Sequence, residues 1–212
     1  MINATINILE SDAQISKSIL KALLPEVNKF LKKSFSKCEK AIPDVVINAI
    51  KSSRTYDSLT SSSGKLRLHF GLPNSKGSVD SIVAALDNIV LDYTKPTIKG
   101  NQITGGFKLS MVRADYADIL GLPAAKVQTE KGDVLEWLQW LLLFGDKTII
   151  KDYQVKIGNN AKSRTGGAVM VKGGRWGVPP EFAGTIKKNW ITEAIDSTED
   201  QIQNILAKSL RS

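Results

Sequence analysis

The first quarter of the chain has the hydrophobic spacing of an amphipathic helix. Ser11 is followed three residues later by Gln14, a capping-box pattern that predicts a helix beginning at this point. Apolar residues then recur every three or four positions as far as Phe35. Pro25 has no backbone hydrogen to donate, so we expect the helix to kink or restart there. A second helical stretch is expected over residues 44–50.

Alternation of polar and apolar residues, typical of half-buried strands, appears further along the chain. The clearest case is KLRLHFGL, residues 65–72, which follows a serine-rich loop signal and places His69 on the polar face. Further strands are predicted over residues 88–93, 106–112 and 147–157, and a short helix over residues 79–86.

The most apolar segment of the chain runs from residue 134 to residue 144. Asp133 suits the start of a helix because its negative charge interacts favourably with the helix dipole there. Gly145 suits the position just past the end because glycine readily adopts the left-handed conformation. The segment contains Trp137 and Trp140, and only two polar residues interrupt it. A helix this apolar must be covered almost all round, so we expect it to be the central helix with strands laid over it.

The last quarter of the chain is predicted to hold two short strands and two helices. The strands are expected over residues 168–171 and 175–178, joined by a hairpin turn at residues 173–174, which are both glycine. The helices are expected over residues 189–196 and 199–210, where apolar residues recur at helical spacing.

These elements together predict an α+β fold. We expect an N-terminal helical arm, a mostly antiparallel β-sheet packed on one buried apolar helix, and a C-terminal helix. The arm is predicted to cover residues 1–54 and an α+β core domain to cover residues 55–212.

Charge is distributed unevenly along the chain, which carries a formal net charge of +8 over 212 residues. Residues 1–54 have a net charge of +4 and residues 151–188 a net charge of +6. Such local fields attract phosphates or an acidic partner, although lysines retained for solubility explain them equally well. Cys38 is the only cysteine, which suits a reducing compartment. The longest apolar run, residues 140–144, is too short to cross a membrane.

The sequence contains no motif of a known catalytic site. The phosphate-binding loop, the dinucleotide-binding glycine motif and the nucleophile elbow are all absent. His69 is the only histidine and has no second ligand residue at metal-binding spacing. We therefore expect no catalytic residue, no metal and no cofactor, although an enzyme site assembled from distant residues stays open.

A nucleic-acid-binding module is the stronger alternative. The second half of the chain offers cations together with aromatic stacking surfaces, namely Arg164, Lys172, Arg175, Lys187 and Lys188 with Trp176 and Phe182. No zinc finger, RNA-recognition motif or helix-turn-helix signature frames these residues, and the aromatic spacing fits core packing at least as well.

A resemblance to known proteins covers roughly residues 136–195. It is carried by EWLQWLLLFGDKTIIKDYQVKIG, then SRTGGAVMV, then GGRWGVPPEFAGTIKKNWITEAI. This ordered set resembles virion structural proteins of tailed bacteriophages, above all the neck and tail-completion proteins at the head–tail junction of contractile-tailed phages. A tail-terminator or head-completion protein of the same particle stays an alternative.

The resemblance implies a non-enzymatic subunit of a ring of six or twelve copies around the channel that DNA traverses. The expected partners are further copies of the chain and other neck, portal-adaptor and tail proteins, with contact to genomic DNA in the lumen and no membrane. The expected location is the virion, assembled in the cytoplasm of the host bacterium.

The local chemistry of the glycine-rich segment agrees with contacts between subunits. Arg164 and Arg175 can make forked contacts to carboxylates on the next subunit or to phosphates. The predicted subunit-interface residues are Arg164, Arg175, Trp176, Pro179, Pro180 and Lys187. The predicted core anchors are Trp137, Trp140 and Trp190, and for every one of these aromatic residues, Trp176 included, a core position is favoured over an interface.

Overall fold

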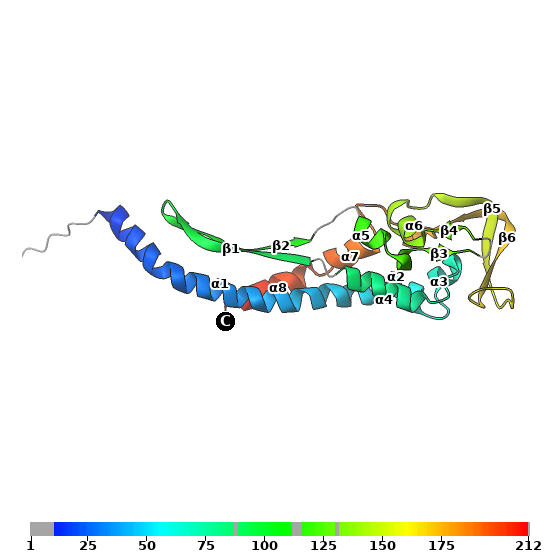
Figure 1. Cartoon of the computed structure of the whole chain (residues 1–212), viewed down its shortest axis with the longest axis horizontal. Coiled ribbons are helices and arrows are strands. Elements are labelled where there is room, and N and C mark those ends of the chain that lie inside the picture. Colours follow the sequence, from blue (N-terminus) through cyan, green and yellow to red (C-terminus); the bar gives the residue numbers. More distant parts are fainter. Residues whose placement is uncertain (1–10, 87–88, 112–115, 130–131, 212) are drawn as a thin grey trace, which may run out of the picture. The chain divides into compact units, whose positions relative to one another are not determined.

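The structure is a computed structural model that describes residues 11–86, 89–111, 116–129 and 132–211. It confirms the α+β class (Figure 1). The helices are α1 (Asp12–Lys51), α2 (Arg54–Thr60), α3 (Lys65–Phe70), α4 (Ser75–Ala85), α5 (Ala117–Leu120), α6 (Trp137–Leu143), α7 (Trp190–Asp196) and α8 (Glu199–Ser209). Two short 3₁₀ helices, η1 and η2, cover Pro123–Ala125 and Pro180–Phe182.

The strands form separate antiparallel pairs. They are β1 (Ile89–Lys99), β2 (Gln102–Met111), β3 (Val127–Gln128), β4 (Val134–Leu135), β5 (Thr148–Ile157) and β6 (Ala168–Gly177). In the described part of the chain they pair as β1–β2, β3–β4 and β5–β6. The prediction of antiparallel pairing is confirmed, but the strands make three two-stranded sheets where one sheet was expected.

The chain folds into two compact units, each made of segments that are distant in the sequence. Unit 1 comprises Met1–Ile42, Val90–Ser110 and Gln203–Ser212, and unit 2 comprises Pro43–Ile89 and Met111–Ile202. Helices α1 and α8 each contribute to both units. These units do not coincide with the expected boundary at residue 54, which stays a prediction about independently folding domains.

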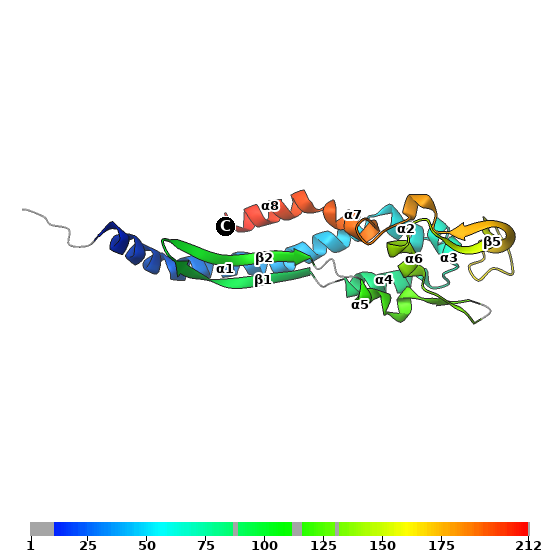
Figure 2. The same cartoon turned by 90° about the horizontal axis from the view of Figure 1, so that it is seen from above.

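Unit 1 packs the β1–β2 hairpin alongside the part of α1 that precedes Pro43, with the first turns of α1 extending beyond the closed end of the hairpin (Figures 1 and 2). The Phe35 ring lies between the rings of Tyr93 and Phe107, with centroid distances of 5.5 and 6.1 Å. The Tyr93 hydroxyl donates a 2.8 Å hydrogen bond to Oδ1 of Asn28, and burial raises the pKa of Tyr93. Aromatic contacts therefore fasten the hairpin to the helix.

The end of α8 also packs on α1 within unit 1. The Ser34 hydroxyl donates to the backbone oxygen of Ser209 at 2.8 Å, and Sγ of Cys38 lies 3.2 Å from Oγ of Ser209. Cys38 is a free thiol and is fully buried. The C-terminal helix thus returns to the N-terminal helix through buried polar contacts between small side chains.

Helix α1 is longer than the sequence pattern indicates. It begins where the capping box predicts, with the Ser11 backbone nitrogen donating to Oε1 of Gln14 at 2.8 Å. The restart expected at Pro25 is wrong, because the helix continues to Lys51 and includes the stretch predicted as a second helix. Each interior proline removes only one backbone hydrogen bond, which the packing of a 40-residue helix offsets.

The core of unit 2 is centred on α6, as the apolar run predicts. Trp137, Leu138, Leu141 and Leu142 are each at most 1 % exposed. Nε1 of Trp137 donates a 3.0 Å hydrogen bond to the backbone oxygen of Ala124, and its ring packs 6.0 Å from Phe70. The helix is shorter than expected, because Val134 and Leu135 form β4 instead.

The predicted strand over residues 65–72 is wrong, since Lys65–Phe70 forms α3. Leu66, Leu68 and Phe70 are all buried, so the alternating pattern correctly identified the buried residues although it predicted the wrong element. In a helix, residues two apart point to nearly opposite sides, so α3 is covered on two sides. The helix ends at Gly71, whose φ of 63° is the left-handed conformation that favours glycine.

The expected hairpin turn at Gly173-Gly174 is also wrong. Residues 168–177 form one strand, β6, and the two glycines lie opposite Asp152 of β5 as a bulge between the pairs Lys151–Arg175 and Tyr153–Lys172. Gly173 and Gly174 have φ values of 100° and 78°, and an extra residue in one strand needs such conformations. The glycine pair bends a strand and does not reverse the chain.

The remaining predicted elements are present with shifted ends. The strand over residues 147–157 is β5, and the helices over residues 79–86, 189–196 and 199–210 are α4, α7 and α8. The strands over residues 88–93 and 106–112 are β1 and β2, which are longer, and residues 88 and 112 themselves lie outside the described residues.

Replacing Leu138 by alanine tests the central role of α6. Leu138 is fully buried, so Leu138→Ala should lower the free energy of unfolding by about 2–5 kcal/mol, through reduced burial and the cavity left behind. Urea unfolding followed by circular dichroism measures the loss. Asp146→Ala, at an exposed position, is the control and should change the unfolding free energy by less than about 0.5 kcal/mol. Equal losses in both variants would contradict the assignment of the core.

Candidate functional site

The glycine-rich segment, residues 163–185, lies entirely in unit 2 and runs through β6 into η2. Arg164, at its start, donates from Nη1 to the backbone oxygen of Gln128. A Cβ atom added at Gly71 would meet Nη2 of Arg164 at 2.8 Å, so the guanidinium lies directly against that glycine. Arg164 is exposed, yet its side chain already contacts its own chain.

Trp176 is the aromatic residue of this segment and lies in the interior. It is 5 % exposed, and its ring centroid is 6.0 Å from that of His69. Nε2 of His69 donates to the backbone oxygen of Gly177 at 2.6 Å. Burial lowers the pKa of His69, because the charged imidazolium is poorly solvated there. The neutral His69 side chain therefore holds the C-terminal end of β6 through its hydrogen bond to Gly177 and its packing on Trp176.

The structure divides the six predicted interface residues by exposure. Arg175, Pro180 and Lys187 are exposed, as is Arg164, whereas Trp176 and Pro179 are buried in the single chain. The residues predicted as core anchors also differ among themselves. Trp137 and Trp190 are 1 % and 4 % exposed, and Trp140 is half-buried with its ring 4.7 Å from Phe144.

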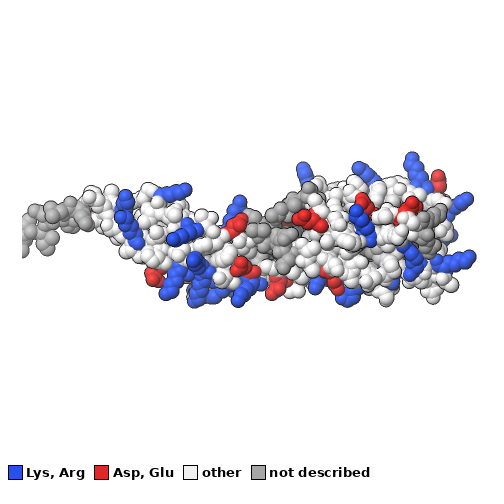
Figure 3. Space-filling model, in the orientation of Figure 1, with Lys and Arg blue, Asp and Glu red and all other residues white. Residues whose placement is uncertain are grey.

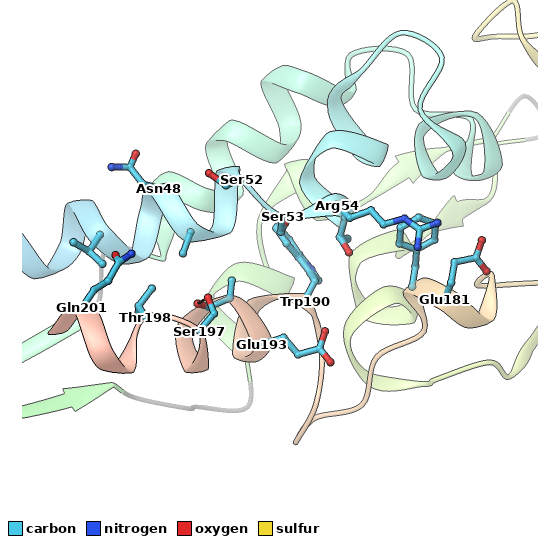
Figure 4. A pocket seen from close by; sticks show the side chains of 15 residues that line it. Asn48, Ser52, Ser53, Arg54, Glu181, Trp190, Glu193, Ser197, Thr198 and Gln201 are labelled. Carbon is cyan, nitrogen blue, oxygen red and sulfur yellow. Dashed lines mark hydrogen bonds between the residues drawn. The ribbon is translucent and has the colours of Figure 1, made fainter. Parts of the chain in front are cut away.

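A hollow of about 680 Å³ opens on the surface of unit 2 between the end of α1, the start of α2, η2 and the α7–α8 segment (Figure 4). Small and polar side chains make up much of its lining, among them Asn48, Ser52, Ser53, Ser197, Thr198 and Gln201. Such a lining offers hydrogen-bond donors and acceptors and leaves room for an inserted group.

Charged and aromatic groups stand at the η2 side of this hollow. The guanidinium of Arg54 lies 5.2 Å from the centre of the Phe182 ring, which is a cation–π contact. The neighbouring Glu181 pairs with Lys65, and this hydrogen bond lowers the pKa of the Glu181 carboxyl. The sequence pattern does not predict the hollow, because its walls come from segments about 130 residues apart.

The indole of Trp190 lines the same hollow and has an unpartnered nitrogen. Trp190 is 4 % exposed, and its Nε1 is buried without a hydrogen-bond acceptor. A buried donor left unpaired costs about 1–3 kcal/mol. The first turn of α7 is otherwise well satisfied, since Asn189 and Thr192 form a capping box.

A second hollow of about 450 Å³ shares this feature. It is lined by the exposed apolar residues Val134 and Ile150 together with Trp140, Trp176 and Thr129. Nε1 of Trp176 and Oγ1 of Thr129 are both buried without a partner. Each of these two hollows in unit 2 is thus lined by a tryptophan whose buried indole nitrogen is unpaired.

A hydrogen-bonded group of ionisable residues joins α2 to α4. The Tyr56 hydroxyl donates to Oδ1 of Asp80 at 2.5 Å, and Nζ of Lys76 lies 2.8 Å from Oδ2 of the same carboxylate. Desolvation and the Asp80 hydrogen bond raise the pKa of Tyr56 to about 12, and the bonds from Lys76 and Tyr56 lower that of Asp80. The Tyr56–Asp80 bond joins the two helices, the Lys76–Asp80 pair lies within α4, and none of the three residues lines either hollow.

The described residues contain neither a metal-binding cluster nor a membrane-spanning helix. No group of three or more His, Cys, Asp and Glu residues among them lies close enough together to hold a metal ion. None of the described helices combines the length and apolar character needed to cross a membrane.

Comparison with known proteins gives no family assignment: no protein-family description, no curated protein and no solved structure matches this chain. The resemblance to phage neck proteins therefore rests on the quoted motifs of residues 136–195 alone.

The lowered pKa values of Asp80 and Glu181 predict a loss of stability in acid. A carboxyl with a lower pKa in the folded chain stabilises the fold above its unfolded pKa, about 4, and this contribution disappears as the pH falls through the folded value. The double variant Asp80→Asn/Glu181→Gln should therefore show a weaker dependence of unfolding free energy on pH between about pH 5 and 2. Urea unfolding across this range measures it, with Asp146→Asn/Asp118→Asn as control. Identical pH dependence in the test and control variants would contradict the two ion pairs.

Proposed function

We propose that this protein is a structural subunit of a tailed-bacteriophage head–tail junction, a neck or tail-completion ring that joins head to tail around the DNA channel. Its role is to bind copies of itself and neighbouring virion proteins, without catalysis. The phage assignment is supported by the ordered motifs over residues 136–195. A tail-terminator or head-completion role in the same particle is the alternative within this proposal.

The observation that carries the assembly role is an apolar stripe on α1. Ile19, Leu23 and Phe30 are 53 %, 49 % and 38 % exposed. Spacings of four and seven residues place the three side chains on one line of the helix. The described part of unit 1 leaves this stripe exposed. Aligned exposed apolar side chains of this kind mark a surface that another molecule covers.

Removing the apolar stripe should weaken assembly and leave the fold intact. The triple variant Ile19→Ser/Leu23→Ser/Phe30→Ser should associate at least about tenfold more weakly, because each buried apolar side chain contributes on the order of 1.5–3 kcal/mol. Size-exclusion chromatography with light scattering and negative-stain imaging measure mass and ring formation. Lys21→Ser/Lys29→Ser/Lys32→Ser, on the exposed side of the same helix, is the control.

Two outcomes would overturn this proposal. A wild-type chain that stays a single copy at every concentration would remove the assembly role. An antibody against the chain that fails to label the head–tail junction of purified particles would remove the phage assignment.

A second function, binding of DNA through its phosphates, is favoured by the charge of unit 1. The segments of unit 1 hold 12 Lys and Arg against 5 Asp and Glu, a net charge of +7, whereas those of unit 2 have a net charge of +1. Figure 3 shows Lys and Arg side chains gathered along α1. Eleven of the 12 cations are lysines, which attract phosphates as point charges without reading sequence.

If unit 1 binds DNA, its affinity for duplex DNA should fall steeply with salt and should not depend on sequence. Replacing Lys29, Lys32 and Lys33 by glutamine should then reduce the slope of log affinity against log salt by about 0.9 for each phosphate that the variant no longer neutralises. Fluorescence anisotropy with labelled duplexes at several salt concentrations measures the slope. Lys147→Gln/Lys151→Gln/Lys156→Gln, in unit 2, is the comparison variant, and an unchanged slope in the unit 1 variant would exclude unit 1 as the DNA surface.

A further inference from the structure

Unit 2 has little net charge, but its charges are separated between two surfaces. The first surface is the basic ribbon, which we define as residues 148–177, comprising β5, β6 and their connection. It contains Lys151, Lys156, Lys162, Arg164, Lys172 and Arg175 against a single acidic residue, Asp152, a net charge of +5. None of the six cations makes an ion pair with another described residue. The positive field of the ribbon is therefore uncompensated within the described chain.

Two cations of the basic ribbon are held side by side. Lys151 and Arg175 are directly paired across the two strands, and both are exposed. Like charges directly opposite each other in an antiparallel pair destabilise it. The bulge at Gly173-Gly174 fixes this register, because it interrupts the pairing immediately after these two residues. A bound anionic group between the two side chains would convert the repulsion into an attraction.

The second surface is the acidic patch, which we define as the exposed carboxylates of residues 189–202. Its members are Glu193, Asp196, Glu199 and Asp200, and this segment contains no lysine or arginine. The segment has a formal net charge of −4, opposite in sign to that of the basic ribbon, and Nζ of the preceding Lys188 lies 3.7 Å from Oε1 of Glu193. It lies on α7 and the start of α8, at the end of unit 2 away from the tip of the β5–β6 ribbon in both views (Figures 1 and 2).

The acidic patch borders the 680 Å³ hollow. Glu193, Thr198 and Gln201 line it, and Figure 4 shows these side chains along the α7–α8 wall. The unpartnered Nε1 of Trp190 is buried in the same wall. The nitrogen itself has no exposed surface, so what the hollow offers to a docking molecule is the carboxylate of Glu193 and the polar side chains of its lining.

We propose that the basic ribbon of one copy docks on the acidic patch and its hollow on the next copy, so that unit 2 associates head to tail. This inference rests on the proposed assembly function and specifies the two surfaces that meet. The opposite signs of the two surfaces select a second copy as the occupant, since each copy carries both halves of a complementary pair. Two unlike surfaces on one subunit give a heterologous contact, which closes into a ring when the rotation between copies allows it.

A charge exchange between the two surfaces tests this pairing in the full-length chain. Lys151→Glu/Arg175→Glu makes the ribbon less basic, and Glu193→Lys/Asp200→Lys reverses two charges of the patch. Either variant alone should associate at least about tenfold more weakly than the wild type at low salt, because like charges then face each other. An equimolar mixture of the two variants should recover association, since each altered surface then meets a complementary one.

Light scattering and sedimentation velocity measure association, and circular dichroism verifies that each variant is folded. Lys29→Glu/Lys32→Glu, in unit 1, carries the same charge change as the ribbon variant and should leave this contact within about twofold of wild type.

The possible outcomes separate the pairing from the assembly role. Rescue in the mixture supports the head-to-tail contact. If both variants assemble as the wild type does, the pairing is wrong and the assembly role survives. If the ribbon variant loses only duplex DNA binding and the mixture shows no rescue, the ribbon binds nucleic acid and the pairing is again wrong. A wild-type chain that never associates overturns both proposals.

Discussion

Burial of the apolar face of α6 is the interaction on which unit 2 depends. Trp137, Leu138 and Leu141 leave almost no surface exposed, so every neighbouring element must supply covering side chains. Helix α3 contributes Phe70, whose ring packs 6.0 Å from that of Trp137. The indole nitrogen of Trp137 also donates a hydrogen bond to the backbone oxygen of Ala124. The close packing continues at Gly184, where a Cβ atom would lie 2.7 Å from the backbone oxygen of Leu141. The segment after β6 is therefore held against the core, and the hollow beside η2 is a fixed feature of the unit.

Local signals predict those parts of this fold that depend on neighbouring residues. The capping box at Ser11, the apolar run that becomes α6 and the α7 start at Asn189 are set by contacts a few residues apart, and they are correctly predicted. The alternating pattern of residues 65–72 wrongly predicted a strand. A short helix that is covered on two sides buries the same residues as a strand that is covered on one side. The hairpin turn predicted at Gly173-Gly174 was wrong for a related reason, because glycine adopts positive φ as readily in a bulge as in a turn.

The candidate surfaces were predicted less completely than the fold, because they combine distant segments. Arg175 was predicted as an interface residue from its charge and its glycine-rich surroundings, and it is exposed, as an interface residue must be in a single chain. Its cross-strand partner Lys151 and the carboxylates of α7 and α8 were not singled out, because strand register and helix placement are needed to see them as surfaces. Trp176 was named for its aromatic side chain, but the packing against His69 places it inside the single chain.

The unsatisfied groups of unit 2 are more informative than its satisfied ones. The buried indole nitrogens of Trp176 and Trp190, which lack an acceptor, and a pair of adjacent cations on the ribbon each destabilise an isolated chain. An interface that brings carboxylates to the ribbon would offset the repulsion between the two cations. The adjacent cations that destabilise the single chain thus favour the binding of an acidic surface, and this is the physical reason for our proposal that unit 2 is part of a larger assembly.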